Sequence, residues 1–257
     1  EIVAYRSPDG ESWSEEGVVS GLEFSADELV SGGAGDPDTL LLVGADFAGA
    51  SSVGPGGRVP IALVSPDGLD WQRVDDEQLA VVKEVTAVTV DRDGSGFLAV
   101  GTGSDADAVP TLVASDDGRE WSPVATTGLE VEDGSEDVGA LAASAGGVVA
   151  FGLTECDDCS DDAVAVGWTS PDGVDWSIAD LGPLADALDE PNTDLVPTVV
   201  GTPTGLVAIV EGGSTGAAST AWLSDDGTEW HEGPDLDVPD NADLLSAAAL
   251  GDDVIAL

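Results

Sequence analysis

A short acidic segment, residues 155–162, holds the most distinctive side-chain chemistry of the chain. Its sequence is Glu-Cys-Asp-Asp-Cys-Ser-Asp-Asp and it carries both cysteines, Cys156 and Cys159. A disulfide that pins a surface loop of an exported protein is the structural interpretation of this pair. A redox role is disfavoured, because no βαβ pattern surrounds the cysteines and the neighbouring acids oppose a thiolate. Two thiolates alone make a poor zinc site.

The aspartates of the same segment offer a second chemistry, since carboxylate oxygens are the ligands that calcium prefers. They are Asp157, Asp158, Asp161 and Asp162. Their spacing does not match an EF-hand loop. Calcium is therefore the one cofactor that the sequence leaves open, and no other cofactor is expected.

The rest of the chain does not identify a catalytic residue. With 52 Asp and Glu residues, pairs of carboxylates occur everywhere by chance. His231 is the only histidine and directly follows Trp230, so it forms neither a triad nor a metal cluster and is expected to be exposed and structural. No glycine-rich phosphate loop precedes a helix.

Five gapless copies of one pattern, Ser-[Pro/Asp]-Asp-Gly-x-x-Trp, organise the chain and recur every 50 to 58 residues. Their Ser, Asp, Gly and Trp residues are Ser7, Asp9, Gly10 and Trp13; Ser65, Asp67, Gly68 and Trp71; Ser115, Asp117, Gly118 and Trp121; Ser170, Asp172, Gly173 and Trp176; and Ser224, Asp226, Gly227 and Trp230. Asp-Gly is a preferred pair for a tight hairpin turn. Ser and Asp side chains bond to nearby backbone N–H groups, and Trp packs as a large apolar wedge. We interpret these residues as structural.

Short β-branched runs separated by Gly and Asp predict four strands per repeat, as at residues 85–90, 97–101, 111–114 and 120–124. The only helical pattern is one short turn near residues 181–188. Periods near 50 residues suit four-stranded propeller blades. The fold class is therefore all-β: a β-propeller of four-stranded antiparallel blades.

A single propeller domain is expected over residues 1–257, with blades at about 16–75, 82–126, 136–180, 193–233, and 242–257 joined with 1–15. The N-terminus supplies a third and fourth strand, and the C-terminus a first and second. Joined, they make a fifth blade and remove exposed sheet edges. A five-blade fragment of a six- to eight-bladed propeller remains the alternative, because the chain opens and closes inside strand-like runs, as expected of a mature or excised segment.

The five copies resemble Asp-box, or bacterial neuraminidase, repeats of the sialidase-like β-propeller superfamily, which includes sialidases, other glycosidases and non-enzymatic propellers. The usual box is Ser-x-Asp-x-Gly-x-x-Trp, whereas Asp and Gly are adjacent in all five copies here, so this is a shortened variant. The resemblance covers the whole chain as a repeat pattern. It implies that each box joins the third and fourth strands of a blade, on the face away from catalytic residues.

The resemblance also implies what a sialidase needs: three arginines that clamp a carboxylate, a Tyr nucleophile with a Glu partner, and an acidic acid/base residue. The chain has five arginines, of which only Arg58 ends a predicted second-to-third strand loop. The single tyrosine is Tyr5, and packing explains it, because other repeats have an apolar residue in the equivalent place: Leu63, Val113, Trp168 and Trp222. Sialidase activity is not expected.

The formal charge of −46, from 52 acidic and 6 basic residues, excludes a nucleic-acid partner because nothing could neutralise phosphates. No apolar run approaches the roughly 20 residues of a membrane span, and a hydrophobic content of 42% argues against disorder. Acids spread over all repeats, with Lys83 as the sole lysine, resemble the composition of proteins from high-salt or marine organisms.

Three functions are compatible with the sequence. The first is a non-catalytic, extracytoplasmic, monomeric propeller that binds an unknown protein or carbohydrate through the loops near residues 48–58, 103–109, 154–163 and 212–219. The second is a carbohydrate-active hydrolase. The third is a calcium-stabilised adhesion module. An extracellular or cell-envelope location fits all three.

The charge leads to a prediction about salt. Self-repulsion destabilises the compact state in dilute buffer, and the Debye length falls to about 3 Å at 1 M salt. We expect the melting temperature to rise between about 0.05 M and about 1 M NaCl. A melting temperature that stays flat or falls over that range contradicts this reading of the acidic surface.

Overall fold

The computed structural model describes most of the chain in thirteen ranges. These are residues 3–6, 14–22, 28–36, 38–47, 58–75, 77–104, 109–129, 136–154, 164–188, 196–211, 219–236, 247–250 and 253–256. The chain divides into two compact units, Glu1–Val124 and Ala125–Leu257, here called unit 1 and unit 2. Of the sequence predictions, those on the first box (Ser7, Asp9, Gly10 and Trp13), on the acidic segment and on most of the four candidate binding loops (residues 48–57, 105–108, 155–163 and 212–218) lie outside the described residues.

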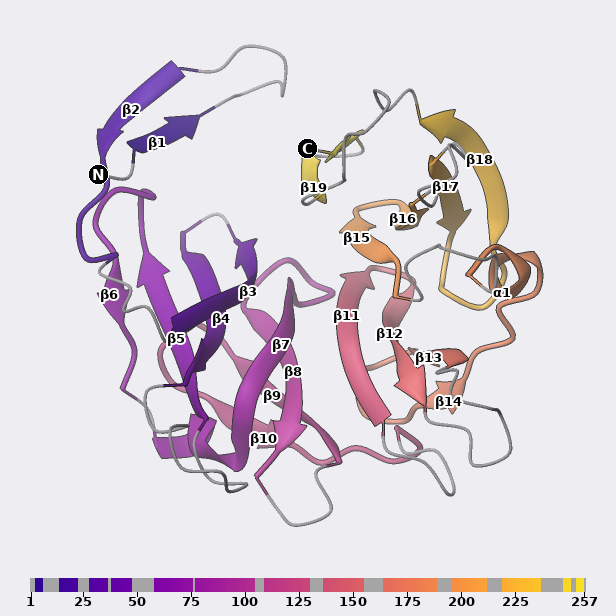
Figure 1. Cartoon of the computed structure of the whole chain (residues 1–257), viewed down its shortest axis with the longest axis horizontal. Helices are drawn as coiled ribbons and strands as arrows, with labels where there is room; N and C mark the ends of the chain where they lie inside the picture. Colours follow the sequence, from indigo (N-terminus) through magenta and orange to yellow (C-terminus); the bar gives the residue numbers. More distant parts are fainter. Residues whose placement is uncertain are drawn as a thin grey trace. The chain divides into compact units, whose positions relative to one another are not determined.

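Each unit contains two four-stranded antiparallel sheets in which neighbouring strands follow one another along the chain (Figure 1). In unit 1, blade A has β3 (Glu28–Gly35), β4 (Leu40–Asp46), β5 (Val59–Ser65) and β6 (Gln72–Arg73), and blade B has β7 (Val82–Val90), β8 (Phe97–Gly103), β9 (Pro110–Ser115) and β10 (Ser122–Val124). In unit 2, blade C has β11 (Glu136–Ser144), β12 (Gly147–Thr154), β13 (Val164–Ser170) and β14 (Ser177–Ile178), and blade D has β15 (Thr198–Thr202), β16 (Gly205–Val210), β17 (Ser219–Ser224) and β18 (His231–Leu236).

The prediction of five complete blades is wrong for the part of the chain that the structure describes, which has four. The remaining strands form two separate two-stranded sheets, β1 (Val3–Arg6) with β2 (Ser14–Val18) and β19 (Ala247–Leu250) with β20 (Asp253–Ala256). We call each of these two-stranded sheets a half blade. The sequence pattern of its strands is the same whether or not it joins a second half blade to make a four-stranded sheet. Sequence periodicity therefore locates these strands but does not count complete sheets.

Apolar side chains between the paired blades form the core of each unit. In unit 1, Leu41, Val64, Phe97 and Trp121 are at most 2% exposed and belong to one cluster from blades A and B. In unit 2, the corresponding cluster joins blades C and D and includes Leu184 and Leu188 of α1 (Pro183–Leu188), the helical turn that the sequence indicates. Middle strands are buried on both faces, which explains continuous apolar runs such as that of β12. No helix of the described residues is long and apolar enough to cross a membrane.

The segments that connect one blade to the next are of two kinds, and the two kinds alternate along the chain. After β2, Ser20 pairs in parallel with Asp70, since its N–H donates to Leu69 O at 2.7 Å and its O accepts from Trp71 N–H at 3.0 Å. In unit 2, Thr127 pairs with Asp175 through equivalent bonds of 3.0 and 2.8 Å.

The other two connections contain a helical turn. The 3-10 turn η1 (Glu77–Val81) follows β6, and α1 follows β14. The second box residue alternates in step, being Pro66, Asp116, Pro171 and Asp225. The repeating element of the described structure is therefore a pair of blades.

Within each unit, one box turn lies directly on the preceding blade. A Cβ added to Gly227 would lie 2.1 Å from Val149 Cγ1 and 3.3 Å from Thr169 Oγ1. The Thr169 hydroxyl also donates to Asp226 O at 3.3 Å. Since Gly227 has a φ of +84°, the position needs glycine both for its backbone and for the space.

A substitution at this position tests the contact. Gly227→Ala should lower the free energy of unfolding by about 2–4 kcal/mol, because it adds overpacking against a stiff buried valine to left-handed backbone strain. Gly182→Ala is the matched control, since Gly182 has a φ of +52° and nothing lies within 4 Å of an added Cβ. The control should cost about 1 kcal/mol in denaturant titrations. Equal losses for the two variants contradict a close box-to-blade contact.

Candidate functional site

The four described boxes share one network of hydrogen bonds. In three of them the box serine Oγ accepts the glycine N–H, at 2.9 Å from Gly68, 2.8 Å from Gly173 and 2.8 Å from Gly227. The indole Nε1–H of every box tryptophan donates to the glycine carbonyl of its own turn at 3.0–3.2 Å. The four box serines are at most 6% exposed. These polar atoms thus serve the turn itself.

The box aspartates accept backbone N–H groups that follow them. Asp117 Oδ1 accepts from Arg119 at 2.8 Å and from Glu120 at 3.0 Å. Partial burial raises the pKa of Asp117, but these two bonds, the Ser115 hydroxyl and the Arg119 charge together hold it below its usual value. The hydroxyl and the N–H of Thr228 likewise lower the pKa of Asp226. An ionised carboxylate is therefore part of the turn.

Among the described residues, no group of three or more His, Cys, Asp or Glu side chains is placed to hold a metal ion. Calcium at Asp157, Asp158, Asp161 and Asp162 and the Cys156–Cys159 disulfide stay predictions, because that segment lies outside the described residues. His231 is exposed, begins β18 and pairs with Leu223 across the sheet.

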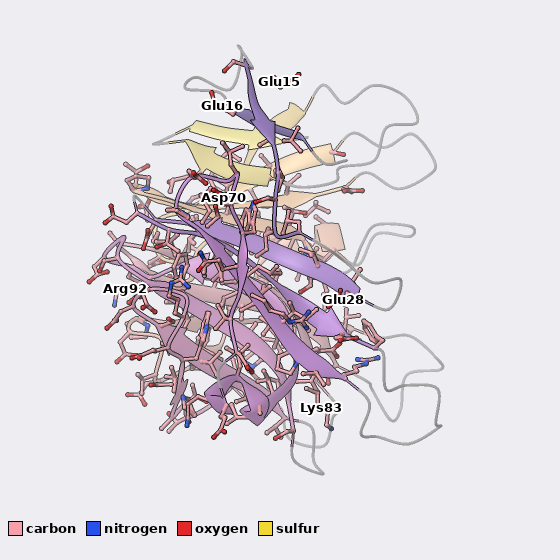
Figure 2. The ribbon with its side chains drawn as sticks, turned by 90° about the vertical axis from the view of Figure 1, so that its left-hand side faces the viewer. Glu15, Glu16, Glu28, Asp70, Lys83 and Arg92 are labelled. Carbon is pink, nitrogen blue, oxygen red and sulfur yellow. The ribbon has the colours of Figure 1, made fainter. Side chains whose placement is uncertain are left out.

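Charged side chains gather at the other end of the blades of unit 1. In an antiparallel blade the box turn and the first-to-second strand turn share one end, and the second-to-third strand loop lies at the opposite end. Figure 2 shows Arg92, in the β7–β8 turn, on one side of the unit, and Glu28 and Lys83, near the starts of β3 and β7, on the other. We call this second side the loop end.

One cluster at the loop end crosses from blade A to blade B. Arg58, at the start of β5, forms an ion pair with Glu84 of β7. The Arg58 guanidinium also lies over the Phe47 ring, 5.1 Å from its centroid. Thr102 Oγ1 donates to Glu84 Oε1 at 3.5 Å. The side chain of Glu84 is 17% exposed and that of Arg58 is 49% exposed. The carboxylate is therefore the more buried partner, and the guanidinium lies nearer the solvent.

A second cluster lies within blade A. Arg73 of β6 forms an ion pair with Glu28 at the start of β3, and its Nη2 lies 3.9 Å from Asp46 Oδ2 at the end of β4. The Glu28 side chain is only 6% exposed, whereas Arg73 is 48% exposed. A buried carboxylate keeps its charge only where it is paired, so Arg73 accounts for the burial of Glu28.

Sequence reasoning found one member of these clusters and missed the others. It placed Arg58 on a loop of the expected binding face, but not Glu28, Phe47, Asp46, Glu84 or Arg73. The available signal was the scarcity of cations. In a chain with five arginines, each arginine predicted near the loop end is a signal for a paired acid, and here that acid lies on the first strand of the next blade for Arg58 and of the same blade for Arg73.

Neither a family model nor a curated protein matches this sequence. Solved structures do match. An α-L-arabinanase of Penicillium chrysogenum, complexed with arabinobiose, is 17% identical with a TM-score of 0.54, over 90% of this chain and 73% of that one. The GH93 α-L-arabinofuranosidase of Fusarium graminearum, also with arabinobiose, is 17% identical with a TM-score of 0.52, over 83% of this chain and 68% of that one.

The chain has a β-propeller fold. At 17% identity these likenesses concern the fold alone. Membership of the Asp-box repeats stays a prediction, resting on the boxes themselves. Three further statements also stay predictions: that residues 1–257 form one domain, that the protein is extracytoplasmic and that it is a monomer.

The ionised box aspartates predict how stability depends on pH. A carboxyl group whose pKa is lower in the folded protein stabilises it above the unfolded pKa, and this contribution is lost as pH falls through the folded pKa. The stabilisation that Asp117 and Asp226 contribute should therefore be lost as the pH falls below about 4, and this loss opposes the relief of charge repulsion among the other acids. Thr228→Val, which removes the strongest donor to Asp226, should reduce this loss, so its melting temperature should fall less steeply as the pH is lowered; Thr204→Val is the control. If the melting temperature of Thr228→Val falls with pH as steeply as that of wild type, the Thr228–Asp226 hydrogen bond does not have the proposed role.

Proposed function

We propose that this protein is a carbohydrate-active propeller that hydrolyses glycosidic bonds at the loop end of unit 1. The observation that carries the proposal is the presence of two arginine–carboxylate clusters at that end, Arg58 with Glu84 and Arg73 with Glu28 and Asp46. The boxes explain the aspartates at the opposite end, whereas no turn requires these acids. The sugar-cleaving enzymes that share the fold support the same class of reaction.

The chemistry of glycoside hydrolysis fits acids held in this way. Most glycosidases use two carboxyl groups, one that protonates the leaving oxygen and one that acts as base or nucleophile. We propose Glu28 and Glu84, the acids of the clusters with the least exposed side chains, as the pair. Their arginine partners favour the ionised form, which suits the base or nucleophile, so the glutamate that donates the proton has to leave its arginine when the sugar binds. Both are fixed by guanidinium groups, whose planar donors orient carboxylates well.

The half-exposed arginines suggest how a sugar is held. A guanidinium has five N–H donors and no acceptor, so Arg58 and Arg73 retain donors for hydroxyl groups while they bind Glu84 and Glu28. By analogy with the α-L-arabinanase and the α-L-arabinofuranosidase that share the fold, we propose arabinose-containing oligosaccharides as the substrate class.

A second candidate is the non-catalytic binding platform. The specific observation in its favour is that both glutamates already bind arginine. Such ion pairs also build a rigid polar surface that recognises a sugar without cleaving it.

Turnover and binding separate the two candidates. With debranched arabinan and arabino-oligosaccharides, wild-type protein should release reducing sugar. Glu28→Gln and Glu84→Gln should each lower kcat/KM by about 100-fold or more, since an acid or base contributes about 10² to 10⁴. The control is Asp116→Asn, an exposed carboxylate in a box turn.

Calorimetry with the same oligosaccharides decides the remaining cases. Binding that is lost in Arg58→Met, without any sugar release, supports the binding platform. If wild-type protein neither binds these oligosaccharides nor releases sugar from them, both candidates are contradicted.

A further inference from the structure

The two units differ in how the charge of their acids is compensated. All six lysine and arginine residues of the chain lie in unit 1, together with 24 acidic residues. Unit 2 has 28 acidic residues and neither lysine nor arginine. With His231 counted as neutral, as at pH 7, the formal charge is −18 in unit 1 and −28 in unit 2. Unit 2 thus carries its charge without a single cation of its own to offset it.

Cations take part in the contacts that hold unit 1 together. Arg58 of blade A forms an ion pair with Glu84 of blade B, and Arg73 joins β6 to β3 through a second ion pair. Arg119 of blade B donates from Nη1 to Gln72 Oε1 of blade A at 3.3 Å. Because the two paired arginines are about half exposed, salt screens these attractions as well as the repulsion among the acids. Salt therefore has two opposed effects in unit 1.

Unit 2 cannot form such pairs within itself, because a salt bridge needs a cation. Blades C and D are joined by the apolar cluster that includes Phe151, Leu206 and Trp222. Acids of this unit that face solvent include Asp175, Asp180, Asp186, Asp225, Glu229 and Glu232. Among these charges salt screens only repulsion, so it favours the compact state.

Each unit also has an apolar core of its own. The buried residues of the unit 1 cluster all lie between Leu41 and Trp121 in the sequence, and those of the unit 2 cluster lie between Ala140 and Trp230. A part of a protein that has its own core can unfold as a cooperative unit while the rest stays folded. The two units therefore meet the condition for separate responses to salt.

We propose that ionic strength controls the folding of unit 2 separately from that of unit 1. In dilute buffer, repulsion among the uncompensated acids unfolds unit 2 in a fraction of the molecules, while unit 1 stays folded. At about 1 M salt the Debye length is about 3 Å, and unit 2 is folded throughout. The order of blades C and D thus follows the salt concentration, whereas the clusters at the loop end of unit 1 persist. This inference does not depend on the proposed hydrolysis.

Hydrogen exchange in the full chain, read by mass spectrometry, measures the unfolding of each unit. The reporters are the amides of the buried second strands, β4 and β8 in unit 1 and β12 and β16 in unit 2. At about pH 8 with EDTA, amides of β12 and β16 should exchange at least about tenfold faster in about 0.05 M than in about 1 M NaCl. Those of β4 and β8 should change by less than about threefold.

A matched pair of double variants separates local repulsion from net charge. Asp225→Asn with Glu229→Gln neutralises two exposed acids in the box of blade D, and Asp116→Asn with Glu120→Gln neutralises the same two positions in blade B. Both variants change the net charge by the same amount. In about 0.05 M NaCl the blade D variant should slow exchange of β12 and β16 at least about threefold. The blade B variant should leave exchange of β12 and β16 unchanged.

Every other outcome counts against the proposal. Equal salt dependence in the two units overturns it in favour of a uniform effect of the net charge, and so do equal effects of the two variants on β12 and β16. Exchange of these strands that does not respond to NaCl also overturns it. If equimolar CaCl₂, added without EDTA in dilute buffer, restores the protection that 1 M NaCl gives, a bound ion and not screening orders unit 2, which overturns the proposal as well.

Discussion

The missing side chain of the box glycine is the constraint on which the described structure depends. At Gly118 and Gly227 a positive φ turns the chain back between the third and fourth strands. The absent Cβ lets that turn rest on a buried pair of residues in the preceding blade. The same residue thus closes a hairpin and packs one sheet on another. The other box side chains form hydrogen bonds with backbone groups of the turn: Ser Oγ and Asp Oδ1 accept from N–H groups, and Trp Nε1–H donates to the glycine carbonyl. The four residue types therefore recur together.

This arrangement leaves the two ends of a blade under different constraints. At the box end nearly every described polar atom of the motif takes part in the turn, so substitution there acts on stability first. At the loop end no box turn joins the strands. The residues at the strand ends there are therefore not fixed by the hydrogen bonds of a turn. Arg58 with Glu84 and Arg73 with Glu28 are cross-strand or cross-blade pairs that no hairpin needs. In a protein with so few cations, their position is more informative than any of the 52 acids taken singly.

Sequence patterns predicted the local structure because local residues determine it. The runs at 97–101 and 111–114 lie within β8 and β9, and the short helical pattern with Pro183 became α1. Pairing over distance could not be predicted in this way. Arg58 and Glu84 are 26 residues apart and Arg73 and Glu28 are 45 apart, so each pair depends on the register of whole strands. The count of complete blades failed for the same reason, since half blades at residues 3–18 and 247–256 have the pattern of whole ones.

The two-blade period places on blade D an equivalent pair with no box from the described residues beside it. Each unit contains one internal interface in which a box covers the pair on the blade before it, and blade D stands last in unit 2. Its pair, Val207 and Leu223, is apolar and Leu223 is 44% exposed, whereas the covered pair of blade C includes Thr169, whose hydroxyl donates to Asp226 O. The close approach of a box therefore depends on the box glycine and not on an apolar pair beneath it, since the covered pairs are leucine with valine in blade A and valine with threonine in blade C.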